Sequence, residues 1–170
     1  IGKEGGKKLV DWVQRGGHVV ALDSSADYLI ELFKLPVTNV LKKVPSSRFS
    51  CPGSMLRLNI NTDHPINYGM RAEEAGYFGR SPAFQTAIPD GRFERRVLAS
   101  YPKEPEDILL SGYLKGADLL TNRIAAVDLQ VGKGRITLIG FHAQQRAQPH
   151  RTFKMLFNSL YLSVLQEVRL

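Results

Sequence analysis

The sequence predicts an α/β fold in which a layered sheet is flanked by helices, and features at both ends of the chain support this prediction. Near the start, a helical segment, a Gly-Gly pair, an apolar run and a second helical segment follow one another. Near the end, two strand-like segments precede a long segment with a helical apolar stripe. A chain of 170 residues suits one domain with a hydrophobic core, which we place at residues 1–170.

The opening of the chain predicts half of a doubly wound sheet. Glu4 to Arg15 is expected to form an amphipathic helix, and Gly16-Gly17 to end it. The run His18–Leu22 is almost unbroken in apolar character, which is typical of a parallel strand that is covered on both faces. A second helix is expected from Ala26 to Lys34, before Pro36. The order helix, strand, sharp turn, helix is that of an open α/β sheet.

The middle of the chain predicts short strands separated by irregular segments. Residues 37–53 look irregular, whereas Met55 to Ile60 alternates in the manner of a half-exposed strand. Tyr113 to Leu120 is expected to form a short helix. Further strand candidates are Gly76–Phe78, Phe84–Ile88 and Arg96–Tyr101.

The end of the chain predicts a hairpin followed by a helix. Ile124 to Val131 and Arg135 to Phe141 are two strand candidates, and Gly132-Lys133-Gly134 joins them in a turn. Pro149 suits the first turn of a helix, which its apolar stripe extends to about Val168.

Composition and charge narrow the classes of partner. The hydrophobic content of 43% and charged content of 23% are those of a globular protein, and no apolar stretch long enough to span a membrane occurs. The net charge of +7 raises the expectation of a polyanionic partner. The basic residues are scattered, however, and no aromatic residues interleave with them, so nucleic acid is not the expected partner. A polyanion-binding module stays an alternative.

The cysteine and histidines predict no metal site in this chain. A single cysteine, Cys51, forms no internal disulfide and no thiolate zinc cage, and its Pro-Gly neighbours favour an inert loop residue. The four histidines, His18, His64, His142 and His150, fit no metal motif. We therefore expect no cofactor within the chain.

The turn after the first apolar run is one candidate site. Ligands of doubly wound sheets bind beyond the carboxyl ends of the strands, where Asp23 and Ser24 lie. A stand-alone hydrolase or transferase would use one of them with His142 or His150. The alternative is that Asp23 and Ser24 cap the following helix, with Ser24 and Asp27 as a short capping box.

The polar loop before the last helix is a second candidate site. Backbone N–H groups at a helix N-terminus favour anions, and Arg146, His150 and Arg151 add positive charge there. These three residues are the predicted ligand-binding set. The alternative is that they pack on one another or on a partner domain.

Several segments, in order, resemble one known family. Together they are similar to the C-terminal, class I glutamine amidotransferase-like domain that follows the peptidase domain in some bacterial zinc carboxypeptidases of the carboxypeptidase A type. The matching segments are Gly16 to Asp23, Pro52-Gly53-Ser54, His64-Pro65 with Tyr68-Gly69-Met70, Arg80 to Phe84, Gly132 to Arg135 with Gly140-Phe141, and Arg146 to His150.

The resemblance implies a flavodoxin-like fold whose first strands lie upstream of Ile1, so that the chain is a fragment of a longer protein. It implies an accessory domain without catalysis in a secreted or periplasmic zinc metallocarboxypeptidase. The zinc would lie in the upstream peptidase domain, which would be the partner of this domain; homo-oligomers are also possible. Glutamine amidotransferases carry a cysteine at the elbow, where this chain has Asp23 or Ser24, so we expect that activity to be absent.

Overall fold

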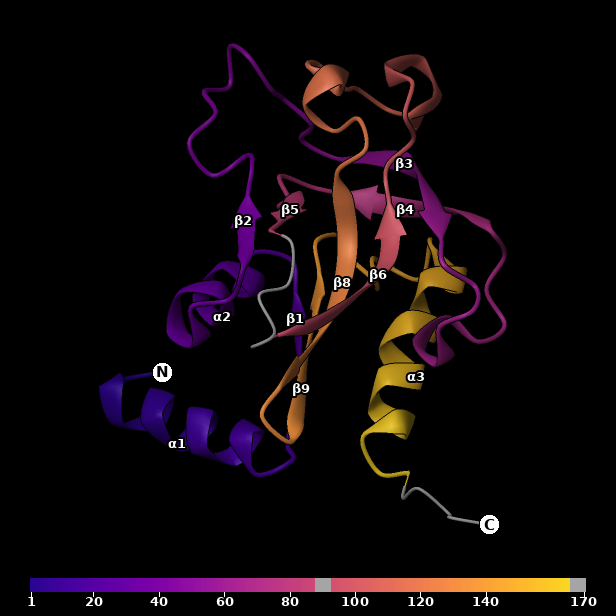
Figure 1. Ribbon diagram of the computed structural model, residues 1–170. Coiled ribbons are helices and arrows are strands. Elements are labelled where there is room, and N and C mark those ends of the chain that lie inside the picture. The colour runs from indigo at the N-terminus through magenta and orange to yellow at the C-terminus, as the bar shows by residue number, and fades with distance from the viewer. Residues whose placement is uncertain (88–92, 166–170) are drawn as a thin grey trace.

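The computed structural model describes residues 1–87 and 93–165 and has one mixed sheet with helices on both sides (Figure 1). Its α-helices are α1 (Lys3–Gln14), α2 (Ser25–Phe33) and α3 (Phe153–Leu162). Its strands are β1 (His18–Leu22), β2 (Val37–Asn39), β3 (Ser54–Ile60), β4 (Glu73–Phe78), β5 (Phe84–Thr86), β6 (Glu94–Ser100), β7 (Leu109–Ser111), β8 (Ile124–Val131) and β9 (Gly134–Ile139). Short 3₁₀ helices are η1 (Pro65–Asn67), η2 (Pro105–Asp107), η3 (Ala117–Leu119) and η4 (His150–Thr152).

The main path of the sheet runs in the order β1-β9-β8-β6-β3-β4. Strands β1 and β9 pair in parallel, with His18 opposite Arg135 and Leu22 opposite Ile139, while the other strand pairs within the described residues are antiparallel. An isolated bridge joins Tyr77 at the end of β4 to His142 beyond β9. Strand β4, the last strand of this path, therefore contacts the segment that follows β9.

Two hydrophobic cores lie on opposite faces of the sheet. One contains Val13 of α1, Leu29 of α2 and the β8 and β9 side chains Leu129 and Leu138. The other contains Met155 of α3 and residues of β3, β4 and β6. Figure 1 accordingly shows α1 and α2 on one side of the β8–β9 pair and α3 on the other.

The structure confirms the α/β fold class and the strongest local patterns. The helix predicted from Glu4, the strand His18–Leu22 and the hairpin of β8 and β9 are present. The alternation in β3 places Leu56, Leu58 and Ile60 in the core, as expected. Periodicity succeeds in these segments because one face of each is buried.

Other local predictions were wrong. The segment predicted to be irregular contains β2, and Tyr113 to Leu120 contains only η3 rather than a helix. Strand β7, with three exposed residues, was missed because it has no apolar alternation. Helix α3 ends at Leu162, short of the predicted end at Val168, which lies outside the described residues.

Strand β1 is also less buried than its apolar run predicted. Only Ala21 is fully buried, because among the described residues β1 pairs on one edge alone, with β9. Among the described residues, no helix combines the length and apolar character that crossing a bilayer requires.

The hairpin turn lies against the end of α1, and glycine makes this contact possible. A Cβ at Gly134 would overlap the backbone carbonyl oxygens of Val13 and Gly17. The neighbouring Gly132 has a φ of +61°, in the left-handed region. Backbone atoms do not yield as a flexible side chain does, so the turn tolerates no side chain at Gly134.

We predict that Gly134→Ala destabilises the fold by about 2 kcal/mol or more, since the added methyl group forces α1 away from the hairpin. Gly2→Ala is the matched control, because a Cβ there meets no atom within 4 Å. It should change the free energy of unfolding by less than about 1 kcal/mol. Urea unfolding followed by circular dichroism measures both, and equal effects of the two variants would contradict the prediction.

Candidate functional site

A sharp turn at the carboxyl ends of β1 and β9 holds the first predicted site residue. Asp23 directly follows β1, and its φ of +52° lies in the left-handed region that L-residues rarely adopt. Its backbone N–H donates to the carbonyl oxygen of Ile139 at 2.8 Å, which fixes the turn to the end of β9. A strained strand-to-helix turn that presents one side chain is the geometry of a nucleophile elbow.

The structure brings Asp23 and His142 together, although 118 positions in the chain, from 24 to 141, separate them. The distance from Asp23 Oδ2 to His142 Nε2 is 3.2 Å, and the side chains are 24% and 29% exposed. The two groups are close but not hydrogen-bonded to each other. Among the described residues, neither His142 Nε2 nor the other carboxylate oxygen, Asp23 Oδ1, has a hydrogen-bond partner. The carboxylate and the imidazole thus lie within ion-pair distance of each other without forming a hydrogen bond.

An aromatic ring packs against this pair, and no pattern in the sequence pointed to it. The Tyr77 ring packs edge-on against the His142 imidazole, with 5.3 Å between centroids. The His142 backbone N–H donates to the Tyr77 carbonyl oxygen at 3.0 Å. A Cβ at Gly79 would lie 3.4 Å from His142 Nε2, so a glycine leaves room beside the ring. Tyr77 lies in β4 and Gly79 follows the end of that strand, and the bridge between Tyr77 and His142 brings this segment to the site.

A buried hydroxyl lies near the elbow. Tyr101 is fully buried and its Oη has no hydrogen-bond partner among the described residues. Burial, with smaller contributions from Cys51 and Asp23, raises the pKa of Tyr101 far above its ordinary value. Tyr101 therefore stays a neutral hydroxyl, and it adds a polar group to the interior side of the site.

The other predicted residues of this site are not part of the same arrangement. Ser24 is exposed and is the N-cap residue of α2. His150 lies in η4 and packs edge-on against Phe153 at 5.8 Å. Among the described residues, no hydrogen bond or ion pair joins His150 to Asp23 or Ser24. Of the two predicted histidines, His142 is the one at the elbow.

The capping alternative is also wrong in its details. No side chain forms a capping hydrogen bond at the N-terminus of α2. Asp27, the predicted partner of Ser24, accepts two hydrogen bonds from the Asn39 amide at 3.1 and 3.2 Å. Ser25 donates to the Leu22 carbonyl oxygen at 2.6 Å and so stabilises the turn. Asp23 points to His142 instead of capping the helix.

All three residues of the predicted ligand-binding set are exposed, and one of them pairs with a buried carboxylate. Arg151 Nη1 lies 3.6 Å from Oε1 of Glu74, whose side chain is only 5% exposed. Arg146 is exposed and has a φ of +47°. His150 is exposed as well. Arg151 thus pairs with a buried carboxylate, whereas Arg146 and His150 form no ion pair with another described residue.

Cys51 lies in the hydrophobic core. Cys51 is buried, and its thiol lies 3.8 Å from the Phe78 carbonyl oxygen. Burial raises the pKa of the Cys51 thiol, which keeps it protonated and unreactive. Within residues 1–87 and 93–165, no group of three or more His, Cys, Asp or Glu side chains is placed to hold a metal ion.

Comparison with known proteins shows the fold. No protein-family model and no curated protein sequence matches the chain. A ThuA-like protein from Parabacteroides merdae is 14% identical with a TM-score of 0.56, and the match covers 98% of this chain and 68% of that one. A ThuA-like protein from Bacteroides uniformis is 14% identical with a TM-score of 0.53, over 96% and 64%. The chain therefore has the class I glutamine amidotransferase-like fold, and no match links it to carboxypeptidases.

A larger enzyme contains a similar region. The β-galactosidase from Bacillus circulans sp. alkalophilus is 13% identical with a TM-score of 0.53, and the match covers 95% of this chain but 21% of that chain. The chain thus spans about a fifth of the β-galactosidase and 64% of the Bacteroides protein. At such identities the similarity concerns the fold alone.

The two arginines of the loop make a matched pair for a stability test. We expect Arg151→Ala to lower the free energy of unfolding by about 1 kcal/mol, because the buried Glu74 carboxylate loses its cation. Arg146→Ala should change it by less than about 0.5 kcal/mol, as for an exposed residue without such a partner. Chemical denaturation measures both, and a larger loss for Arg146→Ala would show that Arg146 is structural.

Proposed function

We propose that this chain is an accessory domain, without catalysis of its own, in a larger enzyme. The observation that supports this best is the residue found at the elbow, the sharp turn after β1. The turn that would present a cysteine in an amidotransferase presents Asp23, and its carboxylate faces His142 at 3.2 Å. The Asp23 carboxylate is held against the imidazole, and it cannot supply the thiolate chemistry of a cysteine.

The partial coverage of similar structures supports the same proposal. In the β-galactosidase a region of this fold makes up 21% of an enzyme chain. A domain of this kind can therefore stand beside a catalytic domain. Its role here would be substrate recruitment, packing against the catalytic domain or oligomerisation.

The parent enzyme that we propose is a secreted or periplasmic zinc metallocarboxypeptidase. This part rests on the resemblance of the ordered segments alone, from Gly16 to His150. The described residues hold no metal-binding group, so the zinc of such a parent would be bound by residues of its peptidase domain. The parent's chemistry would be removal of C-terminal residues from peptides.

The reading frame upstream of Ile1 tests this proposal directly. We expect it to encode a signal peptide and an H-x-x-E motif followed later by a third ligand histidine. The deletion of residues 1–170 from that parent should leave cleavage of a short acylated dipeptide intact and should impair action on larger substrates. A reading frame without any upstream catalytic domain would contradict the accessory role.

A hydrolase that uses the elbow is the second candidate, because the structure brings Asp23 and His142 into contact. In such an enzyme Asp23 would orient the imidazole, and the other ring nitrogen of His142 would take a proton from water. The left-handed backbone at Asp23 is the feature in favour, since strain of this kind gathers at functional sites.

Hydrolysis of p-nitrophenyl acetate separates the two candidates. If the chain is an accessory domain, we expect the rate with the wild-type chain to equal the rate with His142→Asn and Asp23→Asn. His150→Asn is the matched control, because His150 is exposed and has no hydrogen bond or ion pair to the elbow among the described residues. A loss of about 100-fold or more in His142→Asn alone would establish the hydrolase instead.

A further inference from the structure

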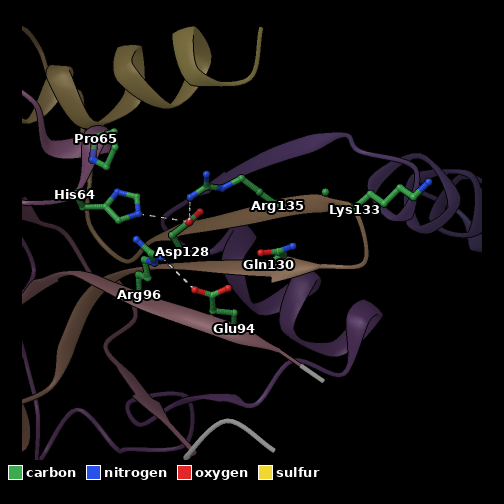
Figure 2. A pocket seen from close by; sticks show the side chains of 9 residues that line it. His64, Pro65, Glu94, Arg96, Asp128, Gln130, Lys133 and Arg135 are labelled. Carbon is green, nitrogen blue, oxygen red and sulfur yellow. Dashed lines mark hydrogen bonds and ion pairs between the residues drawn. The ribbon is translucent and has the colours of Figure 1, made fainter. Parts of the chain in front are cut away.

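A polar cavity of about 410 Å³ opens at the end of β9 that lies opposite the elbow. Strands β6, β8 and β9 and the start of η1 line it, on the face of the sheet that α3 covers (Figure 2). Its volume is within the range of roughly 300–1,000 Å³ that ligand pockets occupy. The polar residues that line it are His64, Glu94, Arg96, Asp128, Gln130, Lys133 and Arg135.

The buried Asp128 carboxylate organises the floor of this cavity. Asp128 is 4% exposed, and the Thr137 hydroxyl donates to its Oδ1 at 2.8 Å. The Arg135 guanidinium pairs with its Oδ2. A buried charge is tolerated only with such partners, so Asp128 holds the Arg135 side chain in place at the cavity wall.

His64 presents an unused donor to the cavity. The side chain of His64 is only 3% exposed. Its Nδ1 accepts a hydrogen bond from the Ile66 backbone N–H at 3.2 Å. The proton of the neutral ring therefore lies on Nε2. Nε2 faces Asp128 Oδ2 at 3.7 Å, which is too long for a hydrogen bond. Burial lowers the pKa of His64, which keeps the ring in this neutral form.

Most of the polar groups in the cavity that are still able to form a hydrogen bond are N–H donors. A guanidinium has five N–H groups, and Arg96 and Arg135 each use Nη2 for one carboxylate, Glu94 at 3.2 Å and Asp128 respectively. The acceptors of Asp128 are already engaged, and Glu94 lies at the exposed rim. Figure 2 shows His64, Arg96 and Arg135 converging around Asp128, while the Lys133 ammonium points away.

We propose that this cavity binds a small ligand through an anionic oxygen group, a carboxylate or a phosphate, held by His64, Arg96 and Arg135. Such a group accepts several hydrogen bonds from cationic and neutral donors, which is the chemistry that the cavity leaves unused. The proposal is independent of the accessory role, because it uses none of the residues of the elbow.

Titration followed by ¹H–¹⁵N NMR tests the proposal with two probes, sodium phosphate and sodium acetate, at constant ionic strength set by sodium chloride. We expect one or both to shift the amides of Ile66, Gln130 and Arg135 saturably. Saturation with phosphate alone assigns a phosphate ligand, and saturation with acetate alone assigns a carboxylate. No saturable shift with either probe would overturn the proposal.

Two arginine variants make the test specific. Arg96→Gln should weaken binding about tenfold, because it removes one charge-assisted donor. Arg48→Gln is the matched control, because Arg48 is 64% exposed and pairs with one carboxylate at 3.3 Å, as Arg96 is 62% exposed and pairs at 3.2 Å. Arg48 lies outside the cavity, so binding should not change. If the two variants weakened binding equally, the chemical shift changes would reflect general attraction between the anion and the positive charge of the protein. That result would overturn the proposal.

Discussion

The placement of β9 between β1 and β8 is the constraint on which both sites depend. The parallel pairing with β1 brings the Asp23 turn to the end of β9, where the Ile139 carbonyl oxygen accepts its N–H. At the other end, the Arg135 N–H donates to the Gly17 carbonyl oxygen at 3.0 Å and ties the hairpin to the exit of α1. One strand of six residues thus fixes the elbow and the polar cavity relative to each other, and a shift of its register would disturb both.

The same strand carries part of a buried chain of polar side chains. His18 Nε2 lies 2.8 Å from the Thr137 hydroxyl, which itself donates to Asp128. Because the single hydroxyl proton goes to the carboxylate, Thr137 must accept from His18, and the neutral His18 ring carries its proton on Nε2. Burial lowers the pKa of His18, which agrees with that form. A chain of this kind costs desolvation but specifies one register for β1, β8 and β9.

Periodicity in the sequence predicted the helices, β1, β3 and the hairpin, because each has one face in a core. It missed β7, which is exposed, and it placed a helix at Tyr113 to Leu120, where the chain forms only one 3₁₀ turn. Asp23 and His142 were both candidates, but their pairing needed the parallel register of β1 and β9. Tyr77 gave no signal, because it reaches His142 only through the return of β4 to the segment beyond β9. The cavity around Asp128 gave none either, since its residues come from three strands and a turn.

The fold shared with ThuA-like proteins and with part of a β-galactosidase sets the position of the elbow but not its chemistry. A turn of this shape presents whatever residue follows β1, and here that residue is a carboxylate opposite an imidazole. The two side chains lie within ion-pair distance of each other, and this contact can persist without any catalytic role. The left-handed backbone of Asp23 is then explained by the geometry of the strand-to-helix connection itself. At the other end of β9, around Asp128, the donors of His64, Arg96 and Arg135 line a cavity with room for a ligand.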